Sequence, residues 1–407
     1  MDEPKSLLIL GRQPKLGLAE LEATLGAEHV LPAGQHALSD IAAEEINFKR
    51  LGGTIKTAQI LSVLDEPGYA PAMEHLKKTV PKHAPPEGKL NLGVSLYGIE
   101  IGLKKLTADL LAIKKASRAS GKSVRIVPNK DLALSSAQIL HNKLTRKGGW
   151  EIIVLCDGNK TYIAQTLFVQ DIEAYAARDQ ARPARDARVG MLPPKLAQII
   201  LNLAIGPLER KVSADLKLEP AQALSKIRVL DPFCGTGVIL QEALLVGCSV
   251  MGTDIDERMV EYSRTNLQWL VGHYPDLEGQ VDIEKADAIN HVWPRFSAVA
   301  TETYLGRPLT QLPPSDKLDQ IISDTNTVIK KFLLNLKDQL KPGQRLCLAV
   351  PAWRRPNGEL IPLPCIAKLT EMGYNYVDLE TVAASELVYF RENQVVARQL
   401  IILESSK

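Results

Sequence analysis

Apolar runs alternate with helix-like stretches along the chain, which is the pattern of mixed α/β structure. Near the amino terminus, residues 7–10 form a short apolar run that predicts a strand, and leucines then recur at helical spacing over residues 18–25. Within residues 48–61, Gly52 and Gly53 mark a turn before a second strand-like run. Because these strands and helices are short and alternate, we expect a small α+β domain over residues 1–65.

A second domain is expected over residues 66–170, after a stretch rich in proline and glycine. The order there is strand, helix, strand, helix, strand, strand, over residues 90–97, 103–117, 123–127, 135–144, 151–155 and 162–168. Residues 171–190 are polar and rich in arginine, as is typical of a connector. Pro193 and Pro194 then open a helix, and a third domain follows over residues 191–407.

The helix predicted over residues 103–117 is amphipathic. Leu106, Leu110 and Ile113 occupy its inner face, which leaves its basic side chains free to face outward. The basic residues of the helix and of the turn after it are Lys104, Lys105, Lys114, Lys115, Arg118 and Lys122. We expect them to contact phosphate groups, and a well-solvated lysine surface is the alternative.

The most informative stretch of the chain covers residues 229–256. An apolar run stops at Asp231, a loop carries Gly235 and Gly237, a helical stretch follows, and a second apolar run ends at Asp254. Glycines allow the backbone to turn tightly and to approach a ligand, and an acid at the end of the second strand can bond ribose hydroxyls. The sequence therefore predicts a cofactor with a nucleoside at the carboxyl end of a parallel sheet.

The spacing of the glycines distinguishes between such cofactors. A dinucleotide fingerprint has a third glycine where Leu240 stands, and here Asp231 and Pro232 precede the loop. Both departures disfavour a nicotinamide or flavin and favour S-adenosylmethionine; a strand-to-helix turn without a ligand is the alternative. The residues expected to hold this cofactor are Asp231, Pro232, Phe233, Cys234, Gly235, Gly237, Asp254, Ile255, Asp287 and Ala288. The last two end a third predicted strand, where an acid commonly meets the adenine amino group in S-adenosylmethionine enzymes.

Composition narrows the class of protein. Hydrophobic residues at 45% and charged residues at 24% are ordinary for a globular protein, and no apolar run approaches the length of a membrane span. The five cysteines form no Cys-x-x-Cys pair, so we expect free thiols, no metal site and a cytoplasmic location. The net charge is +2, but residues 77–147 hold fifteen Lys and Arg against four acids. Such asymmetry suggests a basic module that meets a polyanion.

Further strands are expected beyond residue 256, over residues 281–287, 296–302, 345–353, 374–380 and 397–403. The last two form an antiparallel hairpin. This order matches the seven-stranded sheet of a class I (Rossmann-like) methyltransferase.

Residues 95–127 and 134–144, with the sequences SLYGIEIGLKKLTADLLAIKKASRASGKSVRIV and LSSAQILHNKL, resemble a THUMP domain, the RNA-binding module of several tRNA-modifying enzymes. The segments LAELEA and LGGTIKTAQIL are similar to the ferredoxin-like domain that accompanies THUMP in archaeal-type tRNA guanine-N2 methyltransferases. The resemblance implies a ferredoxin-like domain over residues 1–65, a THUMP-like domain over 66–170, and docking on tRNA.

The acceptor is expected beside the fourth strand of the third domain, since ligands lie beyond the carboxyl ends of strands in open α/β sheets. In the family, that strand ends in Thr-Asp-Pro-Pro-Tyr-Gly. A carboxylate and a main-chain carbonyl there accept hydrogen bonds from an exocyclic amine, and the aromatic ring stacks on the base. This chain has Thr-Glu-Thr-Tyr-Leu-Gly at residues 301–306, without the prolines. The candidate catalytic residues are Glu302, as the acceptor of the amine hydrogen bond, and Tyr304, as the stacking ring.

The altered motif leaves three interpretations. The chain is an S-adenosylmethionine-dependent RNA methyltransferase that acts on N2 of a tRNA guanine, which is the interpretation we favour. Alternatively, its acceptor differs, as in a DNA or rRNA amino-methyltransferase. The third possibility is an RNA-binding relative without activity.

Overall fold

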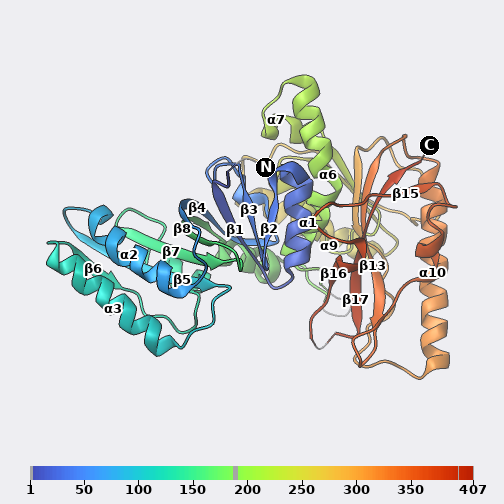
Figure 1. Ribbon diagram of the computed structural model, residues 1–407. Helices are drawn as coiled ribbons and strands as arrows, with labels where there is room; N and C mark the ends of the chain where they lie inside the picture. The colour runs from blue at the N-terminus through green and yellow to red at the C-terminus, as the bar shows by residue number, and fades with distance from the viewer. Residues whose placement is uncertain (1–2, 187–190, 393, 407) are drawn as a thin grey trace. The chain divides into compact units, whose positions relative to one another are not determined.

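The computed structural model describes residues 3–186, 191–392 and 394–406. The chain divides into two compact units, which are coloured along the chain in Figure 1. Unit 1 consists of Met1–Pro14, Glu28–Lys49 and Thr54–Glu173, and unit 2 of Lys15–Ala27, Arg50–Gly53 and Ala174–Lys407.

Unit 1 is built on an eight-stranded sheet with the order β2-β3-β1-β4-β8-β7-β5-β6. Its strands are β1 (Ser6–Leu10), β2 (Leu31–Ala33), β3 (His36–Ser39), β4 (Thr54–Leu64), β5 (Lys89–Tyr97), β6 (Ser123–Ile126), β7 (Gly149–Cys156) and β8 (Thr161–Val169). Strand β5 runs parallel to β6 and β7, and the other pairs are antiparallel. The strands expected from apolar runs in this part of the chain are therefore present.

The sheet of unit 1 is continuous across the domain boundary expected near residue 65. Strand β4 pairs with β8 from Lys56 opposite Val169 to Leu64 opposite Thr161. The apolar core on one face of the sheet also contains residues from both sides of this boundary, because residues of β1 cluster with residues of β7 and β8. The stretches 1–65 and 66–170 thus contribute to one sheet.

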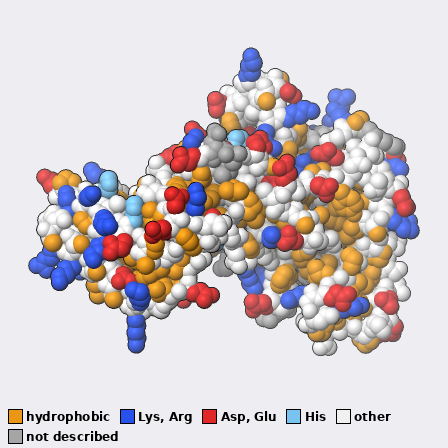
Figure 2. Space-filling view, viewed as in Figure 1, with side chains coloured by type: hydrophobic (Ala, Val, Ile, Leu, Met, Phe, Trp, Pro, Cys, Tyr) orange, Lys and Arg blue, Asp and Glu red, His pale blue; other side chains and the backbone are white. Residues whose placement is uncertain are grey.

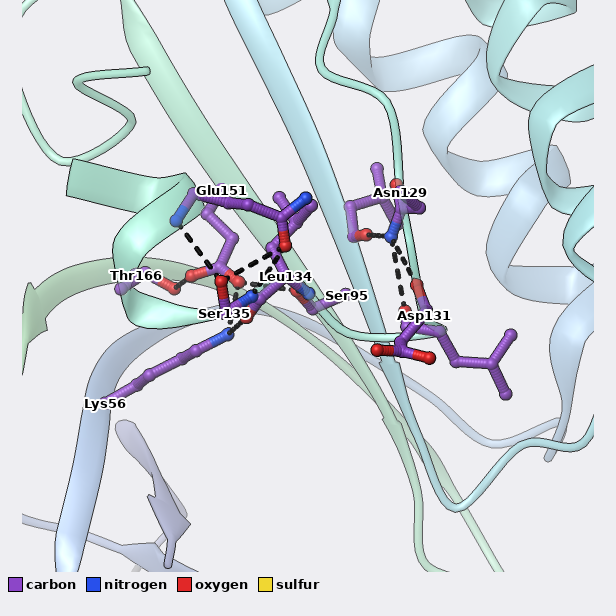
Figure 3. Close-up of polar contacts among 11 residues, drawn as sticks. Lys56, Ser95, Asn129, Asp131, Leu134, Ser135, Glu151 and Thr166 are labelled. Atoms are coloured by element: carbon purple, nitrogen blue, oxygen red, sulfur yellow. Dashed lines mark hydrogen bonds and ion pairs between the residues drawn. The ribbon is translucent and has the colours of Figure 1, made fainter. Parts of the chain in front are cut away.

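A buried ion pair joins β4 to the later strands of this sheet. Lys56 Nζ lies 2.5 Å from Glu151 Oε1, and neither side chain is more than 1% exposed. Figure 3 shows that the hydroxyls of Ser95 and Thr166 point at the same carboxylate, to which they donate at 2.5 and 2.6 Å. Lys56 also donates to the main-chain oxygen of Leu134 at 2.8 Å. Both buried charges therefore have partners, which is the condition for retaining charges in a core.

Three helices complete unit 1, and one of them was not predicted. They are α2 (Tyr69–His83), α3 (Leu103–Ala119) and α4 (Ser136–His141). Helix α2 includes Pro71 and Pro81 and packs Met73 and Leu76 into a core shared with Leu106 and Leu110 of α3. Helix α4 is shorter than the expected 135–144 and begins at a capping box formed by Ser135.

Unit 2 contains the predicted Rossmann-like sheet, which confirms the α/β class. The main path has seven strands in the order β11-β10-β9-β12-β13-β17-β15, and short strands β14 and β16 pair with β13 and β17. The bounds are β9 (Arg228–Asp231), β10 (Ser249–Asp254), β11 (Val281–Lys285), β12 (Ala298–Glu302), β13 (Arg345–Arg354), β14 (Leu360–Ile361), β15 (Tyr374–Tyr376), β16 (Val388–Tyr389) and β17 (Val396–Ser405). Strands β9 to β13 on this path are parallel, and β17 is antiparallel to β13 and β15. The strand order reverses between β9 and β12, which is where such sheets bind ligands.

Helices cover both faces of this sheet. The α-helices described in unit 2 are α1 (Pro14–Leu25), α5 (Ile172–Ala176), which begins at the end of unit 1, α6 (Pro194–Leu216), α7 (Pro220–Leu224), which packs on α6, α8 (Val238–Leu245), α9 (Glu257–His273) and α10 (Ser315–Lys337). Helix α10 packs Ile329 and Phe332 on Leu230 and Leu348 of the sheet, while α6 lies on the opposite side in Figure 1. Within the described residues, no helix has both the length and the apolar character needed to cross a bilayer.

Two segments from the first 53 residues belong to unit 2. Glu20 of α1 is fully buried and accepts hydrogen bonds from the backbone of Gly52 and Gly53 at 2.9 and 2.8 Å, and from Asn202 of α6 at 2.7 Å. Arg50 forms a buried ion pair with Glu209 of α6 at 3.0 Å. The expected first domain therefore contributes to both units.

Candidate active site

A cavity of about 650 Å³ opens at the carboxyl ends of the parallel strands of unit 2, at the reversal of strand order. It is lined by nine of the ten residues expected to hold a cofactor and by both candidate catalytic residues. These are Asp231, Pro232, Phe233, Cys234, Gly235, Asp254, Ile255, Asp287, Ala288, Glu302 and Tyr304. The ends of β9, β10 and β12, and the loop that follows β11 at Lys285, thus meet around one space.

The loop between β9 and α8 is held against the end of β10. Gly235 has a φ of +51°, and its backbone N–H donates to Asp254 Oδ2 at 2.9 Å. Cys234 N donates to the main-chain oxygen of Thr253 at 2.9 Å. The positive φ explains the glycine at 235, because other residues rarely adopt that conformation.

Gly237 does not line the cavity, unlike the other residues expected to hold the cofactor. It has a φ of +80° and caps the start of α8. A Cβ atom at this position would lie 2.9 Å from Ser263 Oγ of α9. This glycine therefore serves the turn and the close approach of two helices, while Gly235 serves the cavity.

Asp231 is the most deeply buried acid of the cavity, at 2% exposed. Its Oδ1 accepts a hydrogen bond from the Thr301 hydroxyl at 2.6 Å and from the Phe233 N–H at 3.2 Å. Burial raises the pKa of Asp231 to about 7, and the charges of Asp254 and Glu302 act in the same direction. This carboxyl group therefore titrates near neutral pH.

The charge of the lining favours a cationic ligand. Seven acids surround the cavity: Asp186, Asp231, Asp254, Asp256, Asp287, Glu302 and Asp324. Arg307 is the one basic side chain among the described residues that line it. Phe233, Ile255 and Val328 supply apolar surface. A ligand with a sulfonium, a ribose and an adenine matches this set, because the acids suit the cation and the hydroxyls and the apolar side chains suit the ring.

Part of the cavity wall comes from the expected connector, which sequence reasoning did not associate with the site. Asp186 of the connector lines the cavity, together with Met191 and Leu192, the first residues of the expected third domain. The segment before them is fixed to the sheet domain, since Ala184 exchanges two hydrogen bonds of 2.9 Å with the Asn266 side chain. Residues 187–190 of the connector lie outside the described residues. The arginine-rich composition gave no signal that this segment would be a wall.

Glu302 lies in the cavity at the end of β12 but already has a partner. Its Oε1 lies 2.8 Å from Nε of Arg398 on β17, and the two side chains are 15% and 5% exposed. Burial raises the pKa of Glu302, and Arg398 opposes that rise. Tyr304 is 43% exposed at the same side of the cavity. The one signal for Arg398 in the sequence is a single charge within the apolar run of residues 396–403.

The basic residues predicted to contact phosphates lie on and after α3 in unit 1. Lys104, Lys114 and Lys115 are exposed, and none of the described acids forms an ion pair with them. Arg118 is also exposed, Lys122 is half-buried, and Lys105 pairs with Asp109 at 3.1 Å. Figure 2 shows basic side chains projecting from the part of unit 1 that Figure 1 labels α3.

A second hollow of about 360 Å³ lies in unit 1 and was not predicted. His83, Arg146, Lys147 and Trp150 are among its lining residues. The excess of basic residues over 77–147 was the only sequence signal for it.

Comparison with known proteins supports the fold and relates part of the sequence to RNA-modifying enzymes. No family model matches the chain. Three relatives are named tRNA (guanine(10)-N2)-dimethyltransferase, and two of them illustrate the match. The one from Methanothermobacter thermautotrophicus is 32% identical over 178 residues, which cover 42% of this chain and 43% of the relative. The one from Pyrococcus abyssi is 33% identical over 163 residues, which cover 40% and 39%. The chain thus matches less than half the length of these relatives.

Among solved structures, TrmN from Thermus thermophilus matches with a TM-score of 0.52 and 17% identity over 98% of both chains. At this identity the match concerns the fold. Unit 2 therefore has the class I methyltransferase fold, and part of the chain is similar in sequence to tRNA guanine-N2 dimethyltransferases.

Proposed function

We propose that the chain is an S-adenosylmethionine-dependent methyltransferase that acts on the exocyclic N2 of a tRNA guanine. The observation that carries this proposal is the single cavity in which the glycine loop and Asp254 face Glu302, Thr303 and Tyr304. The names of the relatives support the choice of tRNA and guanine.

The cofactor would be held by residues at the ends of three strands. Asp254 would accept hydrogen bonds from the ribose hydroxyls, and Asp287 would accept one from the adenine amino group. Ile255 would contact the adenine ring. Asp231 supplies a negative charge toward the cationic part of the ligand. When bound, S-adenosylmethionine supplies an electrophilic methyl group.

The acceptor side would be formed by the end of β12. Glu302 would accept a hydrogen bond from the attacking amine and would take the proton that the amine loses. Its pKa is raised by burial, which favours that proton transfer. Tyr304 is exposed at the cavity and offers a ring on which a base can stack.

Unit 1 would hold the RNA, through the lysines of α3 that have no described acid as a partner. Contacts of this kind attract the phosphate backbone irrespective of base sequence. The choice of nucleotide then depends on the cavity of unit 2.

The test is incubation of the protein with labelled S-adenosylmethionine and unmodified tRNA, followed by mass spectrometry of the nucleosides. We expect N2-methylated guanosine. Cofactor binding without transfer to any class of RNA would overturn the proposal.

A second candidate function is RNA binding without catalysis, which the existing ion pair of Glu302 favours. Methyl transfer by the wild type that is lost in Glu302→Ala, with unchanged tRNA affinity, would exclude it. Competition between tRNA and duplex DNA in the same assay separates an RNA enzyme from a DNA amino-methyltransferase.

A further inference from the structure

We propose that Arg398 is a positioning residue of the acceptor site, which holds one oxygen of Glu302 so that the other serves the incoming amine. The inference deepens the proposed function and rests on it. Arg398 lies 96 residues from Glu302 along the chain and outside the strand-four motif.

The register of the sheet brings the two side chains to the same face. Glu302 of β12 lies opposite Ala349 of β13, and Arg398 of β17 lies opposite Pro351 of β13. Residues opposite one another, and residues two apart on one strand, share a face of a sheet. Arg398 therefore reaches across β13, where the intervening side chains on this face are small, and meets Glu302.

The guanidinium of Arg398 is itself held in place. It is 4% exposed, and its Nη1 donates to Gln394 Oε1 at 3.1 Å. Its Cζ also lies 6.0 Å from the centre of the Tyr389 ring. The planar guanidinium is a donor of fixed direction, so a single Nε–H bond orients the carboxylate.

The contact occupies only one of the two carboxylate oxygens. Arg398 Nε donates to Oε1, and no described residue donates to Oε2 of Glu302. Because Glu302 lines the cavity, this second oxygen is available to a ligand there. The ion pair is therefore compatible with a role of Glu302 as an acceptor and fixes its geometry.

Thr303 is fixed by the neighbouring strand in a similar way. Its N–H and its hydroxyl both donate to the main-chain oxygen of Ala349, at 3.0 and 3.3 Å. The family motif has two prolines after the acid, which stiffen the backbone. Here the anchoring comes from β13 and β17, which explains how a motif without prolines can keep a defined shape.

The charges around Glu302 predict how loss of Arg398 would act. Arg398 is the opposite charge in contact, and Asp231 of β9 is a nearby like charge. Arg307, in the loop after β12, and Asp324 of α10 line the same cavity. Without Arg398, burial and the like charge of Asp231 would act on Glu302 unopposed. The pKa of Glu302 would therefore rise further. A protonated Glu302 is a poorer acceptor for the amine.

The test uses Arg398→Gln, with Arg355→Gln as the matched control, because Arg355 forms an exposed ion pair with Glu359 in the same unit. We expect kcat of Arg398→Gln to fall by about 10- to 100-fold with little change in KM for tRNA. The acidic limb of its pH–rate profile is expected to shift to higher pH. Arg398→Lys, which retains the charge, is expected to restore that limb and part of kcat. The control should match the wild type.

The melting temperature and the cofactor affinity of Arg398→Gln show whether this variant folds. If it folds poorly, a second variant tests the same contact from the side of Glu302. Glu302→Asp shortens the side chain by one methylene, which withdraws the carboxylate both from Arg398 and from the amine. We expect a loss at least as large as that of Arg398→Gln, and a double variant no worse than Glu302→Asp alone, because Arg398 acts only through this carboxylate. Additive losses, or wild-type kcat and pH profile in Arg398→Gln, would overturn the inference. Absence of any methyl transfer by the wild type would instead overturn the proposed function and this inference with it.

Discussion

The backbone N–H of Gly235 donates to Oδ2 of Asp254 at 2.9 Å, so the glycine loop and the acid at the end of β10 are directly bonded. The second oxygen of Asp254 accepts from the Asp256 N–H at 3.0 Å. Asp254 can therefore affect a ligand directly, because it lines the cavity, and indirectly, because it holds the glycine loop.

We therefore expect Asp254→Ala to weaken S-adenosylmethionine binding by about 1 to 3 kcal/mol, because a ribose partner is lost and the Gly235 N–H is left without its acceptor. Isothermal titration calorimetry measures the change. Asp282→Ala is the control, since Asp282 is an exposed acid of β11 that does not line the cavity. Unchanged affinity in Asp254→Ala would show that the ribose lies elsewhere.

Cofactor affinity is expected to depend on pH through Asp231. Its pKa is raised to about 7, so the carboxyl is ionised at pH 8 and largely protonated at pH 6. A cationic ligand prefers the ionised form, and its affinity should therefore fall by up to about tenfold from pH 8 to pH 6.

Binding titrations over this range, in the wild type and in Asp231→Asn, check this expectation. The variant should bind weakly at both pH values, because its amide carries no charge at either. A wild-type affinity that is equal at pH 6 and pH 8 would contradict the role given to this acid.

Much of the site was predictable because its signals are local. The loop glycines, Asp254 and Glu302 follow apolar runs within a few residues, so the sequence places them at strand ends. Arg398 and Asp186 were missed because their roles depend on sheet register and on the path of the connector, which bring together residues far apart in the chain. The pairing of β4 with β8 was missed for the same reason.

Salt dependence of RNA binding should report on α3. Replacement of Lys104, Lys114 and Lys115 by Gln is expected to weaken tRNA binding and to reduce the slope of log K against log salt by roughly 0.7 to 0.9 per lost phosphate contact. Replacement of Lys330 and Lys331, which are exposed on α10 of unit 2, provides the control. Equal effects of the two sets would mean that α3 is only a solvated lysine surface.

The buried ion pair of Lys56 and Glu151 links strands from both sides of residue 65, so we expect unit 1 to unfold cooperatively. Lys56→Met leaves a buried carboxylate without its cation and is expected to lower the free energy of unfolding by about 3 to 5 kcal/mol. Lys78→Met, which removes an exposed pair with Glu74, should cost less than about 1 kcal/mol.

Urea denaturation measures the free energy of unfolding of each variant. Hydrogen exchange of β1 and β5 measures whether these strands unfold together. Strands on either side of residue 65 should lose protection together, since one sheet holds them. Separate transitions for the two strands would contradict a shared core.

Helix α1 carries a consequence for how the protein is made. Glu20 bonds Asn202, a partner 182 residues later in the chain, so α1 leaves the ribosome long before its binding surface on α6 exists. Leu16, Leu18 and Leu21 of α1 are almost fully buried in the finished protein, and most of the unit to which α1 belongs follows residue 173. Synthesis of the last half of the chain thus completes a structure begun by its first 25 residues, and no single cut in the gene can separate unit 2 from unit 1.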